Sequence, residues 1–430
     1  MKKKLKFFIS FLLVIIIAIS AFIVPVSSYE NEVKTSSVSM LLVNLDTDTV
    51  CFSQLAPNKW YASYMSELMT FIVAAERNRN PEEVTVEVKQ DFIYDLPYSD
   101  GSLDLFVGKK LTLKDLMTIM MLTPGSDAAY LIAATVSGGD IDGFVELMNK
   151  KADSIGCKLT HYLTPGYSES SDHYTCCNDM YLIFKSLYTI DLYQEIMKSP
   201  NYTPEGYEDD DNTYEVTTEN SILNPASPYY FRYATGGKYS YSITAGANIF
   251  VTTRYRGKSY FFVALRGKNK SEQNVFADAR RMTSWGYLNL TDRKVIDVDD
   301  AVSEYNITTD WGSYSADLYA SNAAFKTLPK EYDENMLTYS INIPEGVPLP
   351  VFEGQSIGNA KIYYGKEKID DVNLISGSSE GIDLLSDLSH FALYSVSEIL
   401  INEPPTEAPT EAPTAAPTVP PTAPADFAEG

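Results

Sequence analysis

Residues 62–76, ASYMSELMTFIVAAE, decide the fold of this 430-residue chain. The stretch is rich in apolar and helix-forming residues, so it predicts a buried helix that begins near Tyr64. On a helix, side chains three positions apart lie one above the other. We therefore expect Tyr64 to lie beside Glu67 and Ser63 beside Ser66.

The segments on either side of this helix predict an α+β domain over residues 36–290. Residues 39–55 have the pattern of a strand hairpin with a turn at residues 45–48. Residues 112–115, TLKD, have the form of a capping box, which predicts a helix that begins there and ends at residues 124–125. The other predicted elements are helices over residues 127–136, 141–155, 180–188 and 272–287, and a strand hairpin over residues 245–252 and 259–265.

The C-terminal part of the chain has a different sequence pattern from the first domain. Beyond residue 294 it consists of short strand-like runs, such as residues 337–343 and 360–364, separated by turns. This pattern predicts a small all-β domain over residues 294–380. Residues 403–430 form an imperfect E-A-P-T repeat that is too poor in hydrophobic residues to fold, so we expect a disordered Pro/Thr-rich stalk.

Residues 1–28 have the organisation of an export signal. Three lysines follow Met1, an apolar run covers residues 7–24, and small residues come next. The apolar run is long for a cleaved signal and short for a transmembrane span, so a signal peptide and an uncleaved N-terminal anchor both remain open. Either one predicts an extracytoplasmic protein, which is secreted or held at the cell surface by a membrane tether.

Charge and composition exclude several classes of function. With 57 acidic against 34 basic residues the formal net charge is -23, which repels phosphate backbones and excludes a nucleic-acid partner. Cys51, Cys157, Cys176 and Cys177 allow either a disulfide from Cys157 to one of the adjacent pair or four buried thiols. Because the chain has three histidines and no C-x-x-C, we expect neither a metal site nor a cofactor.

Taken in order, these segments resemble the D-alanyl-D-alanine carboxypeptidases, which are low-molecular-weight penicillin-binding proteins of the serine peptidase S11 type. The resemblance is carried by LLVNLDTDTVCFSQLAPNKWYAS at residues 41–63, LMTFIVAAE at residues 68–76, FVELMNKKADSIGCKLTHYLTPGY at residues 144–167 and PLPVFEGQSIGNAKIYYG at residues 348–365. It implies a penicillin-binding-protein/β-lactamase-like transpeptidase domain, followed by a small β-domain. It also implies a serine hydrolase of peptidoglycan in the bacterial cell wall.

Members of this family carry three active-site motifs, and all three are degraded here. In the first, S-x-x-K, the lysine amine draws the proton from the serine hydroxyl. The serine slot holds Tyr64 and the lysine slot Glu67, while the fallback Ser63 is followed three positions on by Ser66 and not by a lysine. Since a phenol has a pKa of about 10, Tyr64 is either an unusual nucleophile or, as we favour, an aromatic side chain that fills a vacated cleft.

The second motif, S-x-N, falls on Pro124, Gly125 and Ser126. Proline has no hydroxyl, so the serine that would relay protons is missing. Ser126 is expected either to hydrogen-bond a ligand or to cap the following helix, and we favour the cap.

The third motif, K-T-G, aligns with Ala234, Thr235 and Gly236, so the cation that would bind the terminal carboxylate of the substrate is missing at this position. Lys238 lies two residues beyond Gly236 and shares its strand face if the strand is regular. Lys238 could replace the missing cation, although a solvated lysine in a loop is the interpretation we favour.

The leading hypothesis is an exported, catalytically inactive family member with a binding or scaffold role in the cell envelope. Its partner would be a peptidoglycan stem peptide or a cell-envelope protein, bound through Ser126, Thr235 and Lys238. One alternative is an active D-Ala-D-Ala carboxypeptidase with a rearranged set, such as Ser63 or Ser126 with Lys238 or a histidine. A surface-display stalk protein is the other. The two histidines near the motifs, His161 and His173, are expected to be structural.

Overall fold

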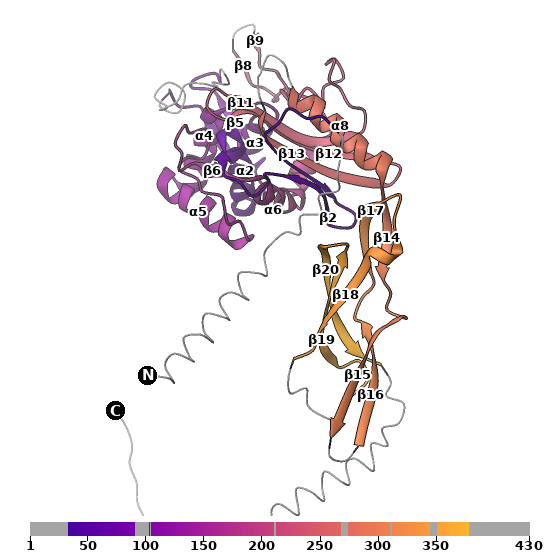
Figure 1. Cartoon of the computed structure of the whole chain (residues 1–430). Helices are drawn as coiled ribbons and strands as arrows, with labels where there is room; N and C mark the ends of the chain where they lie inside the picture. The colour runs from indigo at the N-terminus through magenta and orange to yellow at the C-terminus, as the bar shows by residue number, and fades with distance from the viewer. Residues whose placement is uncertain are drawn as a thin grey trace, which may run out of the picture.

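The computed structural model of the chain describes residues 33–90, 103, 105–209, 212–267, 274–309, 312–344 and 351–377. The predicted signal or anchor over residues 1–28 and the predicted stalk over residues 403–430 lie outside the described residues. Figure 1 shows a mixed helix and sheet body followed by an elongated region of strands.

A five-stranded antiparallel sheet, in the order β11-β12-β13-β1-β2, is the centre of the first domain. Its strands are β11 (Ala234–Ser242), β12 (Gly246–Tyr255), β13 (Lys258–Gly267), β1 (Ser39–Asn44) and β2 (Thr49–Gln54). Because β1 pairs with both β13 and β2, strands from the two ends of the domain meet in one sheet. Both predicted hairpins are confirmed.

Helices pack on both faces of this sheet. α8 (Asn274–Asn289) packs against the face that carries Leu42 and Ile249. The opposite face, which carries Leu41 and Phe250, packs against the remaining helices (Figure 1). These are η2 (Ser63–Ser66), α2 (Glu67–Arg77), α3 (Leu113–Leu122), α4 (Ser126–Ser137), α5 (Ile141–Ser154), α6 (Cys177–Tyr188) and α7 (Asp191–Ile196).

Local sequence signals explain where these helices begin and end. The predicted capping box is confirmed: Asp115 N donates to Thr112 Oγ1 at 3.0 Å, and Thr112 N donates to Asp115 Oδ2 at 2.8 Å. The helix predicted over residues 62–76 is present as the 3₁₀ turn η2 running directly into α2. Tyr64 therefore lies in the tight turn, whereas Glu67 is the first residue of the α-helix.

The second domain is built of strands, as predicted. β14 (Leu290–Ile296) pairs with β17 (Ala324–Pro329), and a five-stranded antiparallel sheet has the order β15-β16-β20-β19-β18. Its strands are β15 (Ala301–Thr309), β16 (Gly312–Ala320), β18 (Leu337–Asn342), β19 (Ser356–Tyr364) and β20 (Glu367–Ser376), with the turn η5 (Glu334–Met336) before β18.

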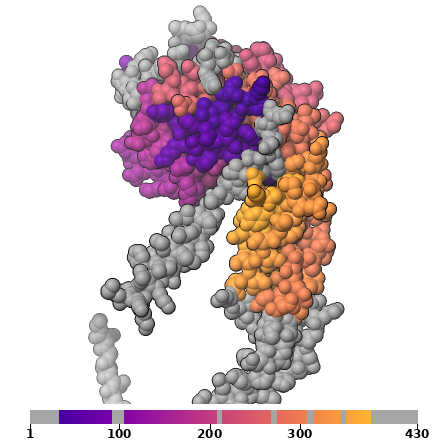
Figure 2. All heavy atoms as spheres, viewed as in Figure 1, coloured from indigo at the N-terminus to yellow at the C-terminus, as the bar shows by residue number. Residues whose placement is uncertain are grey.

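The two domains touch where the β1–β2 turn meets β17, and Figure 2 shows the strand-built domain extending from the larger body. Thr327 N donates to Thr49 Oγ1 at 3.2 Å, and Thr327 Oγ1 lies 2.6 Å from Thr47 Oγ1. The remaining strands form short pairs: β3 (Trp60–Tyr61) with β6 (Tyr174–Thr175), β4 (Thr85–Glu87) with β5 (Lys110–Thr112), β7 (Asn201–Tyr202) with β10 (Val216–Thr217), and β8 (Glu208–Asp209) with β9 (Asn212–Thr213).

The cysteines Cys51, Cys157, Cys176 and Cys177 are buried and free. Of the two interpretations left open by the sequence, the structure therefore has buried thiols and no disulfide. Across the described ranges, no helix has both the length and the apolarity needed to cross a membrane.

Candidate active site

Tyr64 is enclosed where η2 meets the sheet. Its side chain is 4% exposed, and its ring stacks on Tyr167 with centroids 4.9 Å apart and an interplanar angle of 15°. Stacked aromatic rings at this separation stabilise one another beyond the area that they bury. The ring of Tyr64 is thus packed as part of the domain interior, and that it fills a vacated cleft stays a prediction.

Glu67 is completely buried, and its two carboxylate oxygens have different partners. Gly125 N donates to Oε1 at 2.9 Å, and Lys238 Nζ lies 2.9 Å from Oε2. Burial raises the pKa of Glu67, while the Lys238 ammonium and the Gly125 N–H act in the opposite direction. Glu67, which we predict to occupy the base slot of the first motif, is therefore bound to the Gly125 backbone and to a strand lysine.

Lys238 lies in the middle of β11 and is 1% exposed. Besides its ion pair with Glu67, its Nζ donates to the Met120 carbonyl at 2.5 Å. The prediction of a solvated lysine in a loop is therefore wrong. Residues 237–242 continue the strand, paired in register with β12, so the side chain of Lys238 points into the domain rather than into solvent.

The residues assigned to the third motif lie elsewhere on β11. Ala234, Thr235 and Gly236 begin the strand, and Thr235 is exposed, with its Oγ1 2.9 Å from Thr252 Oγ1. The structure does not bring these residues to Glu67; it brings Lys238 there. Of the three predicted ligand contacts, Lys238 and Ser126 are buried and Thr235 is not, so they do not form one open surface.

Two serines near Lys238 were missed by the sequence analysis. Because side chains alternate along a strand, Lys238, Ser240 and Ser242 share one face of β11. Ser63 Oγ donates to Ser242 Oγ at 3.3 Å, and Ser240 Oγ is buried without a hydrogen-bond partner among the described residues. The alternation of polar residues at positions 238, 240 and 242 was the signal that could have identified this face.

Ser126 does not cap α4, contrary to the favoured prediction. Gly125 is the N-cap residue, with an extended backbone, and Ser126 is the first residue of the helix. Its Oγ instead accepts a hydrogen bond from Tyr167 N at 3.2 Å. The residue before the helix is thus Gly125, whose N–H donates to Glu67 Oε1 at 2.9 Å.

The two histidines bond to the framework. His173 is fully buried, and its Nδ1 accepts from Leu163 N at 3.0 Å, while His161 Nδ1 lies 2.7 Å from the Asp172 carbonyl. Burial lowers the pKa of His173 to about 4, although the nearby backbone of Ser63 opposes this shift. His173 is therefore neutral near pH 7, in agreement with the predicted structural role.

The chemistry open to this centre is limited by these pairings. Activation of a serine hydroxyl needs a general base, such as an amine, an imidazole or a carboxylate, within hydrogen-bonding reach of it. Among the described residues, the Oγ of Ser63 bonds to Ser242, the Oγ of Ser66 donates to backbone carbonyls, and Lys238 bonds to Glu67 and Met120. The same ranges hold no group of three or more His, Cys, Asp or Glu placed to bind a metal ion.

Comparison with known proteins gives matches along nearly the whole described chain. Residues 26–269 match the family described as D-alanyl-D-alanine carboxypeptidase, and residues 291–380 match the C-terminal domain of penicillin-binding protein 5. The D-alanyl-D-alanine carboxypeptidase DacF of Bacillus subtilis (strain 168) is 21% identical over 363 residues, which cover 83% of this chain and 89% of the relative.

Solved structures show the same fold. The D-alanyl-D-alanine carboxypeptidase DacD from Francisella tularensis has a TM-score of 0.63 at 16% identity, and the alignment covers 82% of this chain and 96% of that one. Penicillin binding protein 5 from Haemophilus influenzae has a TM-score of 0.62 at 19% identity, covering 82% of this chain and 99% of that one.

Proposed function

The chain belongs to the D-alanyl-D-alanine carboxypeptidase family, which acts in cell-wall metabolism, and from this premise we propose that it is an exported, non-catalytic member. Its role in the envelope is that of a binding or scaffold protein. The observation that carries this proposal is the buried ion pair between Glu67 and Lys238.

The position of this ion pair supports the absence of catalysis. A lysine in place of Glu67 would be the base for a serine in place of Tyr64, but a carboxylate and a phenol occupy these slots. Removing one partner of a buried ion pair leaves an uncompensated charge that costs about 3–5 kcal/mol. Lys238 is therefore held by Glu67 and is not available as a base for a serine.

The same pair argues against ordinary substrate binding in the cleft. In the family, a strand cation binds the terminal carboxylate of the substrate, and here the strand cation Lys238 is paired with the carboxylate of Glu67. A stem peptide bound through Lys238, with Ser126 and Thr235 as further contacts, would have to displace an internal carboxylate. The proposed partner is thus either a peptidoglycan stem peptide that opens this pair or a cell-envelope protein that binds elsewhere on the fold.

Covalent labelling by a fluorescent penicillin tests the proposal. An acyl-enzyme forms only if a serine hydroxyl is activated, so we expect no labelled band after denaturing electrophoresis, while an active carboxypeptidase labelled in parallel gives one. Stable labelling at any serine of this chain would overturn the proposal. Unfolded protein would also remain unlabelled, so folding is verified in the same sample by circular dichroism.

The alternatives predict different results in the same experiments. An active hydrolase with a rearranged set would release D-alanine from a stem pentapeptide, and a substitution at Ser63, Ser126 or Lys238 would abolish this release. A surface-display protein would bind no stem peptide at all. Ser63 Oγ bonds to Ser242, Ser126 Oγ bonds to Tyr167 N, and Lys238 Nζ bonds to the Met120 carbonyl. These contacts therefore do not favour the first alternative.

A further inference from the structure

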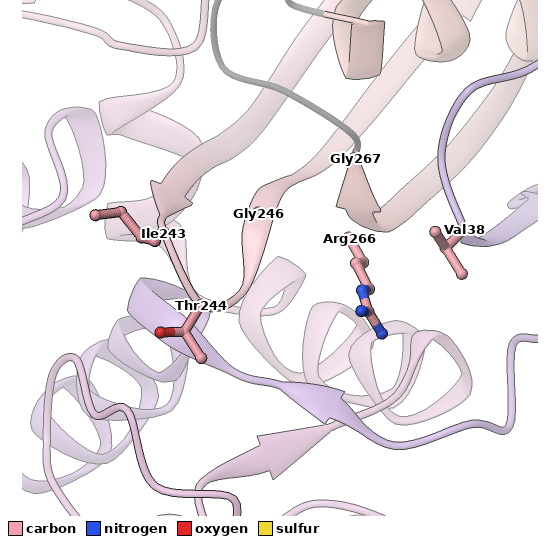
Figure 3. A pocket seen from close by; sticks show the side chains of 6 residues that line it. All are labelled: Val38, Ile243, Thr244, Gly246, Arg266 and Gly267. Atoms are coloured by element: carbon pink, nitrogen blue, oxygen red, sulfur yellow. The ribbon is translucent and has the colours of Figure 1, made fainter.

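Two pockets of the fold carry opposite charge. The first has a volume of about 390 Å³ and lies at the end of the central sheet, beside the β11–β12 turn. Figure 3 shows Arg266 directed into the space between Thr244 and Val38, and its guanidinium lies 4.9 Å from the centroid of the Trp60 ring. Arg266 is the only charged residue of the lining, so this Arg266 pocket is cationic, but its lining selects no single class of anion.

The second pocket lies in the strand-built domain and is acidic. It has a volume of about 240 Å³, and its lining comes from the end of β14, the start of β15 and residues 332–339. Three carboxylates line it, those of Asp297, Asp300 and Glu334. The one lining ammonium, Lys294 Nζ, pairs with Asp297. In the described part of the chain, Asp300 and Glu334 form no ion pair, so two carboxylates of the pocket have no cationic partner.

A tyrosine ring lies next to these carboxylates. Tyr339 is 41% exposed, and its hydroxyl donates to the Val295 carbonyl at 2.6 Å, which fixes the ring in the wall of the pocket. Burial raises the pKa of Tyr339, and the charges of Asp300 and Glu334 add to the shift, which places both carboxylates near the ring. A cation is attracted by an aromatic ring and by carboxylates alike. The pocket is therefore suited to an ammonium or guanidinium group.

The strand that carries Tyr339 is an edge of the five-stranded sheet, since β18 pairs with β19 alone among the described strands. Gly365 N donates to the Met336 carbonyl at 2.7 Å, which makes these two residues a hydrogen-bonded pair directly before β18. Bonded and non-bonded pairs alternate along antiparallel strands. The backbone groups at positions 338, 340 and 342 therefore point to β19, and those at positions 337, 339 and 341 point to the free edge.

This edge lacks the usual protection against pairing. β18 has the sequence LTYSIN, without a charged residue or a proline. The other edge strand of the sheet, β15, carries Glu304. Proteins commonly blunt exposed strand edges with charges, prolines or bulges, because an open edge pairs with other chains. The free edge of β18 is thus suited to the addition of a strand.

We propose that β18 and the acidic pocket dock an extended segment of a partner protein, whose backbone pairs with the free edge and whose basic side chain enters the pocket. A residue opposite Tyr339 would exchange two backbone hydrogen bonds with it. The Cβ atoms of the two residues would lie about 5 Å apart on the same face of the sheet, so a lysine or arginine there lies beside the pocket. The pocket is smaller than the ~300–1,000 Å³ of typical small-molecule sites, and it therefore fits one side chain.

This docking surface is separate from the first domain. Neither β18 nor the acidic pocket includes a residue of the Glu67–Lys238 centre. Strand addition would give the proposed scaffold role a partner, a cell-envelope protein with a basic extended segment, but it does not require an inactive centre. The penicillin labelling and the titration below therefore test the two proposals separately.

Calorimetric titration of the full-length protein with acetyl-Thr-Val-Thr-Lys-Thr-Val-Thr-amide tests the proposal. In an extended peptide the lysine and both valines share one face, so they can lie opposite positions 339, 337 and 341 of β18. Replacing the lysine by norleucine keeps the length of the side chain and removes its charge. We expect the norleucine peptide to bind at least fivefold more weakly, because the two unpaired carboxylates then gain no cation.

A pair of N-methylated peptides tests the strand pairing. In the proposed register the backbone N–H of the lysine bonds to β18, whereas the N–H of the threonine after it points away. Methylation of the lysine N–H should weaken binding at least tenfold, and methylation of the threonine N–H should leave it within twofold. Acetyl-lysine methylamide, which offers the cation without a strand, should bind at least tenfold more weakly than the peptide.

Matched double variants test the pocket. Asp300→Asn/Glu334→Gln removes two lining carboxylates and should weaken binding of the lysine peptide at least fivefold. Asp299→Asn/Glu331→Gln removes the same charge from residues that do not line the pocket, and should bind within twofold of the wild type. The four residues are exposed, so both variants are expected to fold.

Four results would overturn the proposal. They are no binding of the lysine peptide at ~5 mM, equal binding of the norleucine peptide, equal binding of the two N-methylated peptides, and equal loss of affinity in the two double variants. Binding of acetyl-lysine methylamide as tight as that of the peptide would also contradict it, because the edge of β18 would then contribute nothing.

Discussion

The Glu67–Lys238 centre and the Arg266 pocket place two cations on the same sheet in opposite states. Lys238 is buried in the middle of β11 and is held by an internal carboxylate and a carbonyl. Arg266 is exposed at the end of β13 and forms no ion pair among the described residues. One cation of the sheet is thus part of the packed interior, while the other lies at the edge of the sheet without a charged partner among the described residues.

Breaking the buried pair is the strongest way to test this comparison. Glu67→Leu leaves the Lys238 ammonium buried without its carboxylate, so we expect a loss of about 3–5 kcal/mol in the free energy of unfolding. Urea denaturation measures this loss. The double variant Glu67→Leu/Lys238→Met removes both charges and should recover most of it.

A surface pair is the control for this experiment. Glu146 and Lys150 form an ion pair on α5 in which both side chains are 71% exposed. Glu146→Ala should change the free energy of unfolding by no more than about 0.5 kcal/mol. If Glu67→Leu changed the free energy of unfolding as little as Glu146→Ala, the buried ion pair would not stabilise the domain as we argue.

The pH dependence of stability tests the effect of burial on a second titratable group, because His173 is buried beside Ser63. Its pKa of about 4 in the folded chain lies below the value of 6.5 for an unperturbed histidine, so the unfolded chain binds more protons between these values. The resulting stability is fully present above pH 6.5 and is lost as the pH falls to 4. We expect His173 to account for about 3 kcal/mol of this loss.

The variant His173→Asn cannot titrate and keeps an acceptor for Leu163 N. Denaturation at pH 7 and pH 4 should therefore show a smaller acid-induced loss in this variant than in the wild type. His161→Asn, at the half-buried histidine that contacts the Asp172 carbonyl, should behave like the wild type. An unchanged pH dependence in His173→Asn would contradict the burial argument.

The smallest expected effect has the opposite sign. Arg266→Gly removes a strained positive φ of 58°, so we expect the free energy of unfolding, measured by urea denaturation, to rise by about 0.5–1 kcal/mol. Arg256→Gly, at a positive φ of 51°, should give a similar gain in stability. A stability loss in Arg266→Gly comparable to that in Glu67→Leu would mean that Arg266 is a structural residue and that the two regions do not differ as we argue.

Much of the framework could be predicted because its signals are local. The capping box at Thr112 and Asp115 has both partners within one turn, and the hairpin of β1 and β2 needs only an alternating pattern and a short turn. Each element could therefore be assigned without knowledge of its neighbours. The predicted cap at Ser126 was wrong, because the Oγ of Ser126 bonds to Tyr167 N, which is remote in sequence.

By itself, the sequence determined the fold family, because the segments that carry the resemblance follow one another in order along the chain. Only the tertiary structure decided that Lys238 is a buried strand residue, that it meets Glu67, and that Arg266 and Val38 share a pocket. Those contacts depend on the register of β11, on how η2 packs against it, and on the pairing of β1 with β13. Such relations join distant segments, and no local pattern encodes the distance between them.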